Sequence, residues 1–105
     1  MKAVRDLLNK LEYKCIFGNL DREVTQVVYD SRKIVEGCMF ICIKGANFNG
    51  HDYAKEACEK KVACIVVCED TVVPTSADTT IIWVEDTRYA MAFISAQWFG
   101  NPAEQ

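Results

Sequence analysis

Three short apolar runs recur along the chain, and they constrain its fold more than any other feature of the sequence. They lie at Cys38–Ile43, Ala63–Cys68 and Thr80–Val84. Apolar runs of this length, without polar alternation, are typical of strands that are buried on both faces of a sheet. A fourth segment, Val24–Tyr29, is rich in β-branched residues and also favours a strand. We therefore expect a sheet that is covered on both sides.

Helical periodicity appears before, between and after these runs. Apolar residues recur at helical spacing over Lys2–Glu12, and a second helix is predicted over His51–Lys61. Asp86 is a good N-cap for a third helix that runs to Phe99, and Gly100 stands where a left-handed C-cap is expected. Polar loops connect these elements, including residues 69–78.

The order of elements indicates an α/β fold. Helix, strand, strand, helix, strand, strand and helix follow one another along the 105 residues. Such alternation predicts a single three-layer domain, with a small, mostly parallel sheet flanked by helices. No internal repeat is visible, and residues 101–105 are interpreted as the start of a linker.

Charge and hydropathy exclude several classes of protein. The formal net charge is −3, and no basic face is visible, so we expect no nucleic-acid partner. No apolar run approaches the roughly 20 residues that a membrane span needs, so no membrane association is expected. Charged residues interrupt the apolar start of the chain, which argues against a signal peptide. These features predict a cytoplasmic protein.

The cysteines are interpreted as packing residues. There are six of them, no two form a C-x-x-C pair, and the chain has one histidine. The chain therefore lacks the ligand spacing and the histidines that are typical of cysteine and histidine metal sites, and we predict no metal ligands. In a reducing compartment we expect six free thiols that act as small hydrophobic groups.

Two polar loops follow predicted strands and form the candidate ligand site. They are Asp30-Ser31-Arg32 and Lys44–Gly50. Ligands of open α/β sheets bind beyond the carboxyl ends of the strands, so a joint site is expected there. A hydroxyl and a guanidinium together suit a phosphate, although the same triplet can simply cap the end of a strand.

The second loop supports two interpretations. Gly45 and Gly50 have the spacing of a phosphate-binding loop, but His51 and Asp52 follow instead of lysine and a hydroxyl residue, so nucleotide hydrolysis is not expected. The amides of Asn47 and Asn49 can pair with the edge of a base such as uracil, and the Phe48 ring can pack on the base. Alternatively, the asparagines and glycines only form the turn.

No catalytic constellation emerges from the residues. Ser31 has no histidine base at a recognisable spacing, and His51 is predicted to cap or to form hydrogen bonds. The acidic pairs of the chain lie in polar turns and are expected to be solvated.

Four motifs together resemble the N-terminal domain of Mur ligases. They are Tyr29–Arg32, Glu36–Phe40, Lys44–Tyr53 and Val84–Arg88. The usual family patterns are DSR, a PGD-L/M-F turn into a strand, KG…DGHDF and VxDTRxALA. The match covers nearly the whole chain in order and spacing. The ending Trp98–Pro102 is similar to the MurE branch, which adds the third residue of the peptidoglycan stem peptide.

This resemblance implies a substrate-binding role. The domain would bind the UDP moiety of UDP-N-acetylmuramoyl-L-Ala-D-Glu, with Tyr29 and Ser31 at the uridine diphosphate. Ala46, Asn47 and Phe48 would form the uracil-side loop, and Arg32 and Lys44 are further candidates. The alternatives are a MurF-type ligase, which adds D-Ala-D-Ala, and a stand-alone α/β interaction module.

The resemblance also implies what the chain alone lacks. The parent enzyme would be an ATP-dependent amide-bond ligase that uses ATP and Mg²⁺. The family's ATP-binding loop, GTNGKT, does not occur in this sequence. We therefore expect residues 1–105 to carry no cofactor and no activity alone, with the ATP-binding and C-terminal domains further along the parent chain. Lys61 replaces the usual glycine at the end of a helix, and a left-handed lysine there would cost roughly 1 kcal/mol.

Overall fold

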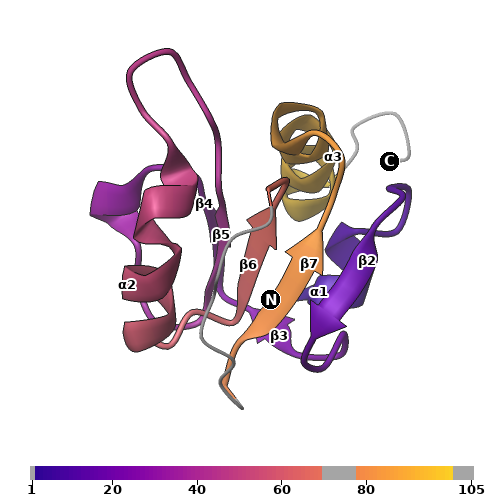
Figure 1. Cartoon of the computed structure of the whole chain (residues 1–105). Helices are drawn as coiled ribbons and strands as arrows, with labels where there is room; N and C mark the ends of the chain where they lie inside the picture. The colour runs from indigo at the N-terminus through magenta and orange to yellow at the C-terminus, as the bar shows by residue number, and fades with distance from the viewer. Residues whose placement is uncertain (1, 70–77, 101–105) are drawn as a thin grey trace.

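A five-stranded sheet forms the centre of the computed structural model, which describes residues 2–69 and 78–100. The strands follow the spatial order β2-β7-β6-β5-β4, and neighbours from β7 to β4 are parallel (Figure 1). Their bounds are Lys14–Phe17 for β2, Gln26–Val28 for β4, Cys38–Ile41 for β5, Cys64–Val67 for β6 and Thr80–Trp83 for β7. The predicted mostly parallel sheet is confirmed.

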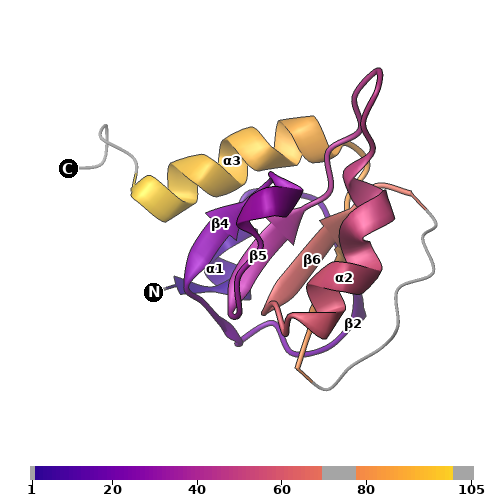
Figure 2. The same ribbon diagram turned by 90° about the vertical axis from the view of Figure 1, so that its left-hand side faces the viewer.

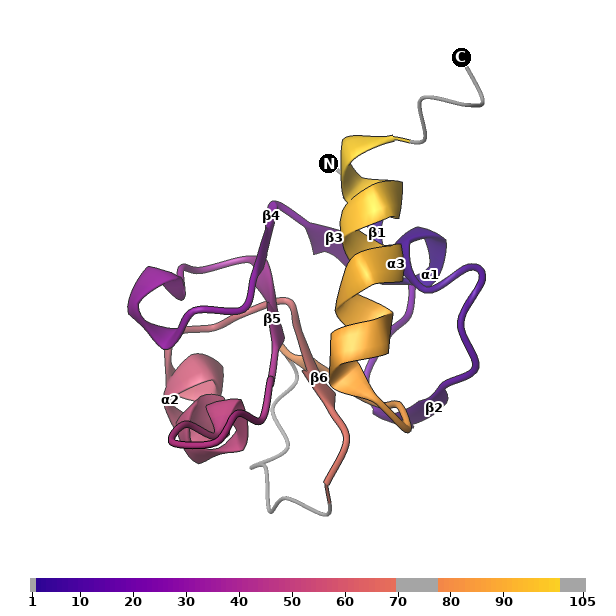
Figure 3. The same ribbon diagram turned by 90° about the horizontal axis from the view of Figure 1, so that it is seen from above.

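Helices cover both faces of this sheet and give three layers. On one face lies α2 (Ala54–Glu59), which continues from the 3₁₀ helix η2 (Gly50–Tyr53). On the other face lie α1 (Val4–Leu7) and the longer α3 (Thr87–Phe99), which contact each other (Figure 2, Figure 3). A further 3₁₀ helix, η1 (Ser31–Lys33), follows β4.

Strands β5 and β6 are buried at every position, as their apolar runs predict. Met39 and Ile41 belong to the core beneath α1 and α3. Phe40, which alternates with them along β5, belongs to the core beneath α2. The same alternation places Val66 and Ile65 of β6 in opposite cores. No described helix combines the length and hydropathy that crossing a bilayer requires.

The first predicted helix is wrong in extent. Instead of running over Lys2–Glu12, the chain forms the short strand β1 (Lys2–Ala3), and α1 then ends at Leu7. β1 pairs antiparallel with β3 (Glu23–Val24), and the Val4 N–H donates to the Arg22 carbonyl at 2.9 Å. Pairing with a distant segment thus places the first two residues of the predicted helix in a strand and gives the Val4 N–H, which would be unpaired in the first turn of a longer helix, a partner.

Strand β2 is an element that the sequence analysis missed. It pairs antiparallel with β7, with Lys14 opposite Trp83, and closes one edge of the sheet. All four of its residues are exposed, and the three consecutive apolar residues at 15–17 form a run too short to predict a strand.

The helix termini confirm one prediction and correct two. Asp86 caps α3, because its Oδ1 accepts from the N–H groups of Arg88 at 2.9 Å and Tyr89 at 3.2 Å. Gly100 has a positive φ of 79° but a ψ of 157°, so it is not the left-handed C-cap expected. The predicted helix over His51–Lys61 begins as the tighter η2, and the Asn49 side chain caps η2 by accepting from the His51 N–H. The predicted linker at residues 101–105 and most of the polar loop over 69–78 lie outside the described residues.

Candidate functional site

Four connections leave the carboxyl ends of parallel strands at one edge of the sheet. After β5 the chain forms a hairpin of residues 43–50, which extends beyond this edge before η2 begins (Figure 1, Figure 2). Backbone bonds close the hairpin: the Gly50 N–H donates to the Ile43 carbonyl at 2.7 Å and the Gly45 N–H to the Phe48 carbonyl at 2.6 Å. Ala46 and Asn47 are therefore exposed at its tip.

Gly50 closes the base of the hairpin because no larger residue fits. A Cβ on Gly50 would lie 2.8 Å from the Ile43 nitrogen and 3.0 Å from the Cys42 Cα. The second glycine of the loop is thus explained by a close backbone approach rather than by phosphate binding.

The segment after β4 presents a serine beside an ion pair. The Asp30 side chain caps η1 by accepting from the Arg32 N–H at 2.9 Å. The Arg32 guanidinium pairs with the same carboxylate, with Nη2 2.9 Å from Oδ2. These hydrogen bonds lower the pKa of Asp30 to about 2, so the carboxylate stays ionised at neutral pH. Ser31, which lies between Asp30 and Arg32 in the sequence, is only 9% exposed.

One cavity joins residues of both predicted loops. It has a volume of about 500 Å³. Its lining residues are Tyr29, Asp30, Ser31, Arg32, Ile43, Phe48 and Tyr53. The structure therefore brings Tyr29, Ser31, Arg32 and Phe48 together at the predicted edge of the sheet.

A second cavity of about 350 Å³ lies along the hairpin. It is lined by Lys44–Asn49, Asp52 and Tyr53. Ala46, Asn47 and Lys44 line this cavity but not the first one, whereas Phe48 lines both.

Tyr53 is a site residue that the sequence analysis did not single out. Its ring stacks on Phe48, with centroids 5.7 Å apart and planes inclined by 22°, and it lines both cavities. The available signal was its place as the last residue of the Lys44–Tyr53 motif, three positions after the loop. The two rings form a shared aromatic wall suited to a flat ligand.

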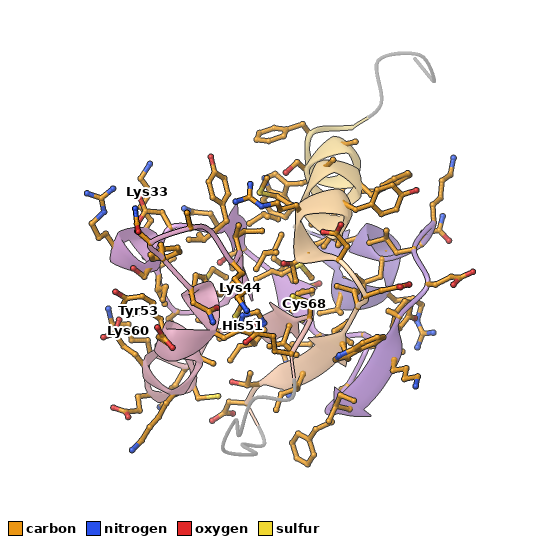
Figure 4. The ribbon with its side chains drawn as sticks, turned by 45° about the horizontal axis from the view of Figure 1, so that its top comes forward. Lys33, Lys44, His51, Tyr53, Lys60 and Cys68 are labelled. Atoms are coloured by element: carbon orange, nitrogen blue, oxygen red, sulfur yellow. The ribbon has the colours of Figure 1, made fainter. Side chains whose placement is uncertain are left out.

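Lys44 is held in place by two neighbouring elements. Its ammonium lies 3.1 Å from Oε2 of Glu69, which follows β6, and its carbonyl accepts from the Arg88 guanidinium at 3.3 Å. The hydrogen bonds from Lys44 and Asn49 lower the pKa of Glu69. Arg88 and Lys44 also line a third cavity, of about 720 Å³, between the start of α3 and residues 10–12. Figure 4 shows Lys44 beside His51 and Cys68 at this edge of the sheet.

The described side chains suit binding rather than covalent chemistry. They supply an aromatic wall, the hydroxyl of the buried Ser31 and the exposed amide of Asn47. Within residues 2–69 and 78–100, no three histidine, cysteine or acidic side chains gather as metal ligands would. Each of the six cysteines is a free thiol, and Cys38, Cys42 and Cys64 are buried. Burial raises the pKa of the Cys64 thiol, so this group stays protonated.

Curated relatives resemble almost the entire chain. A UDP-N-acetylmuramoyl-L-alanyl-D-glutamate–2,6-diaminopimelate ligase of Clostridium perfringens is 40% identical over 102 residues, which are 97% of this chain and 21% of the relative. The corresponding ligase of Clostridium botulinum is 42% identical over 93% of this chain. The chain therefore spans about a fifth of the length of these relatives.

Solved structures share the fold. MurF from Acinetobacter baumannii matches 91% of this chain with a TM-score of 0.73 at 20% identity, and the match covers 20% of that protein. MurF ligase from Thermotoga maritima matches 72% of this chain and 17% of its own length, with a TM-score of 0.59 at 30% identity.

A family model agrees with these similarities. The model described as Mur ligase family, catalytic domain, matches residues 23–99, which include both predicted loops and α3. Sequence, fold and family model together lead to one conclusion: the chain belongs to the Mur ligase family, in which it corresponds to the N-terminal domain.

Proposed function

We propose that this chain binds the UDP moiety of UDP-N-acetylmuramoyl-L-Ala-D-Glu, as the N-terminal domain of a cytoplasmic, ATP-dependent ligase of peptidoglycan biosynthesis. One observation carries the proposal: the buried Ser31 hydroxyl and the exposed Phe48 ring, 17 positions further along, line the same cavity. Its volume of about 500 Å³ lies within the usual range for small-molecule sites.

Each candidate residue has a role that follows from its chemistry. The stacked rings of Phe48 and Tyr53 offer apolar area to a pyrimidine, and the Asn47 amide can pair with the edge of that base. Ser31 can donate its hydroxyl to an oxygen of the diphosphate. Tyr29 lines the cavity beside it.

The two basic candidates contribute less than the serine. The Arg32 guanidinium is already paired with Asp30, and its side chain is 88% exposed. Lys44 is paired with Glu69. We therefore assign to both residues a general attraction for the negatively charged ligand rather than a direct hydrogen bond.

The relatives support a MurE-type parent over a MurF-type one. The diaminopimelate ligases reported above are 40% and 42% identical to this chain, whereas the MurF proteins of Acinetobacter baumannii and Thermotoga maritima are 20% and 30% identical. ATP and Mg²⁺ would then act in other domains of the parent enzyme, and this chain would bind the UDP moiety of the substrate.

A titration with UDP, followed by amide NMR spectra, tests the proposal. We expect shift changes confined to residues 29–32 and 45–50. Ser31→Ala should weaken binding by about 1–3 kcal/mol, because it removes a hydrogen bond to a charged group. Ser95→Ala is the matched control, since Ser95 lies on α3 and lines none of the cavities described above.

Three results would contradict the proposal. The first is the absence of shift changes at millimolar UDP. The second is a set of changes remote from the two loops. The third is an equal loss of affinity for Ser31→Ala and Ser95→Ala. Each of these outcomes would favour a stand-alone interaction module.

A further inference from the structure

The hairpin 43–50 is tied to the end of β6 by His51, a side chain that lines neither of the two cavities assigned to the ligand. His51 lies in η2 and is 5% exposed. Its Nδ1 is 2.7 Å from Oδ1 of Asn49, in the hairpin. Its Nε2 is 3.0 Å from the backbone nitrogen of Cys68, which follows β6. The ring therefore connects two segments that are 17 or more residues apart.

The partners of the ring determine its protonation state. The Cys68 N–H can only donate, so Nε2 must be an unprotonated acceptor. The proton of the neutral ring then sits on Nδ1 and is donated to Asn49 Oδ1. A protonated imidazolium carries hydrogen on both nitrogens and cannot accept from Cys68. The hydrogen bond to the Cys68 N–H thus exists only in the neutral ring, whereas Nδ1 lies 3.8 Å from Oε1 of Glu69 and can attract this carboxylate when the ring is protonated.

Glu69 ties both sides of the hairpin to the same place. Its Oε1 accepts from Nδ2 of Asn49 at 3.3 Å, and its Oε2 lies 3.1 Å from the ammonium of Lys44. Lys44 and Asn49 face each other across the hairpin in an isolated β-bridge. Glu69 and the Cys68 N–H therefore hold the base of the hairpin from the end of one strand.

We infer that neutral His51 is a positioning residue that fixes the hairpin 43–50 against the end of β6, and that protonation of its ring releases the hairpin and weakens ligand binding. The effect on ligand binding rests on the proposed function. The connection between ring protonation and hairpin position does not. Because a released hairpin moves Phe48 away from Ser31, the cavity can bind the ligand only while the His51 ring is neutral.

The charges around the ring set the pH at which release occurs. Burial lowers the pKa of His51 below its ordinary 6.5, and Lys44 lowers it further, while Glu69 and Asp52 act in the opposite direction. Between the folded-state pKa and 6.5, the unfolded chain binds the proton more readily than the folded one. The stability from His51 is therefore complete above 6.5 and is lost as the pH falls through the folded-state pKa.

The single histidine of the chain allows a direct test without ligand. Nitrogen NMR of the ring should show hydrogen on Nδ1 and none on Nε2 at about pH 8, and a pKa below 6.5. The amides of residues 44–50 and of Cys68 should shift with the same midpoint. Hydrogen on Nε2, or hairpin amides that do not follow the titration of the ring, would overturn the inference. This part of the test needs no variant.

A matched pair of variants separates positioning from general stability. The oxygen of His51→Gln can still accept from Cys68 and does not titrate, whereas His51→Ala cannot accept. We expect His51→Gln to keep the hairpin amides near their wild-type positions and to lose the pH response. His51→Ala should displace them at every pH. If His51→Gln behaves like His51→Ala, or keeps the wild-type pH profile, the inference fails.

Ligand binding is then measured with UDP over the same pH range, comparing the wild-type chain with His51→Gln. The comparison removes the titration of UDP itself, which is common to both. One pH unit below the pKa of His51, the wild-type affinity should be about tenfold weaker than that of His51→Gln. At that pH only about a tenth of the wild-type molecules have a neutral ring and can bind the ligand. Equal pH profiles would refute the coupling. If UDP binds neither protein, the proposed function fails, and the ring and hairpin amides still decide whether His51 positions the hairpin.

Discussion

Lys61 adopts a left-handed backbone conformation, with a φ of 60°, in the turn between α2 and β6. The lysine thus adopts the conformation whose cost was considered from the sequence, and its replacement of a glycine does not abolish the turn. It is the sole non-glycine residue with positive φ among residues 2–69 and 78–100. Its carbonyl accepts from the Gly37 N–H at 3.1 Å, which helps to hold the strained turn. A Cβ in this conformation costs roughly 1–2 kcal/mol.

Lys61→Gly should stabilise the chain. Glycine relieves the steric strain, and the greater freedom of glycine in the unfolded chain offsets part of the gain. We expect the free energy of unfolding to rise by about 0.5 kcal/mol in urea titrations. Lys60→Gly is the control, because the φ of Lys60 is −86° and glycine brings no relief there. A loss of stability in both variants would show that the turn is not strained.

At the scale of elements, α3 depends on its N-cap. Asp86 accepts from two backbone N–H groups of the first turn, and its carbonyl accepts from the Ala90 N–H at 3.0 Å. Asp86→Ala should lower the free energy of unfolding by about 1 kcal/mol. Glu85→Ala, one residue earlier and also exposed, should change it little. Equal effects of the two substitutions, measured by thermal and urea unfolding, would contradict a capping role.

The same element also braces the candidate site. Arg88, two residues after the cap, reaches the Lys44 carbonyl at 3.3 Å. A frayed first turn would therefore loosen one support of the hairpin as well as the helix. Helix, hairpin and strand end form one assembly at this edge of the sheet.

At the scale of the whole molecule, the chain spans 21% of a relative that is named as a ligase. We expect the 105-residue chain to show no ATP turnover in the presence of Mg²⁺, because the loop at Gly45–Gly50 is not followed by the lysine and hydroxyl residue that bind phosphate and metal. A coupled assay for ADP release measures this. Turnover that rises in proportion to the concentration of pure chain would overturn the expectation.

Local patterns predicted much of the architecture. The apolar runs at β5 and β6 indicated strands buried on both faces, and Asp86 marked the start of α3, because both signals are carried by neighbouring residues. The position of both polar loops after parallel strands also predicted that Ser31 and Phe48 would approach the same edge. Whether these residues bind uridine diphosphate stays a prediction.

Other features were decided by the tertiary structure alone. β2 became an edge strand by pairing with β7, although its exposed residues carry no periodic signal. The first helix began only at Val4 because Lys2 and Ala3 pair with the distant strand β3. His51 was expected to form hydrogen bonds, but its partner Cys68 lies 17 residues away in sequence. Sequence patterns report spacing along the chain, whereas these contacts depend on which strand ends the folded sheet brings together.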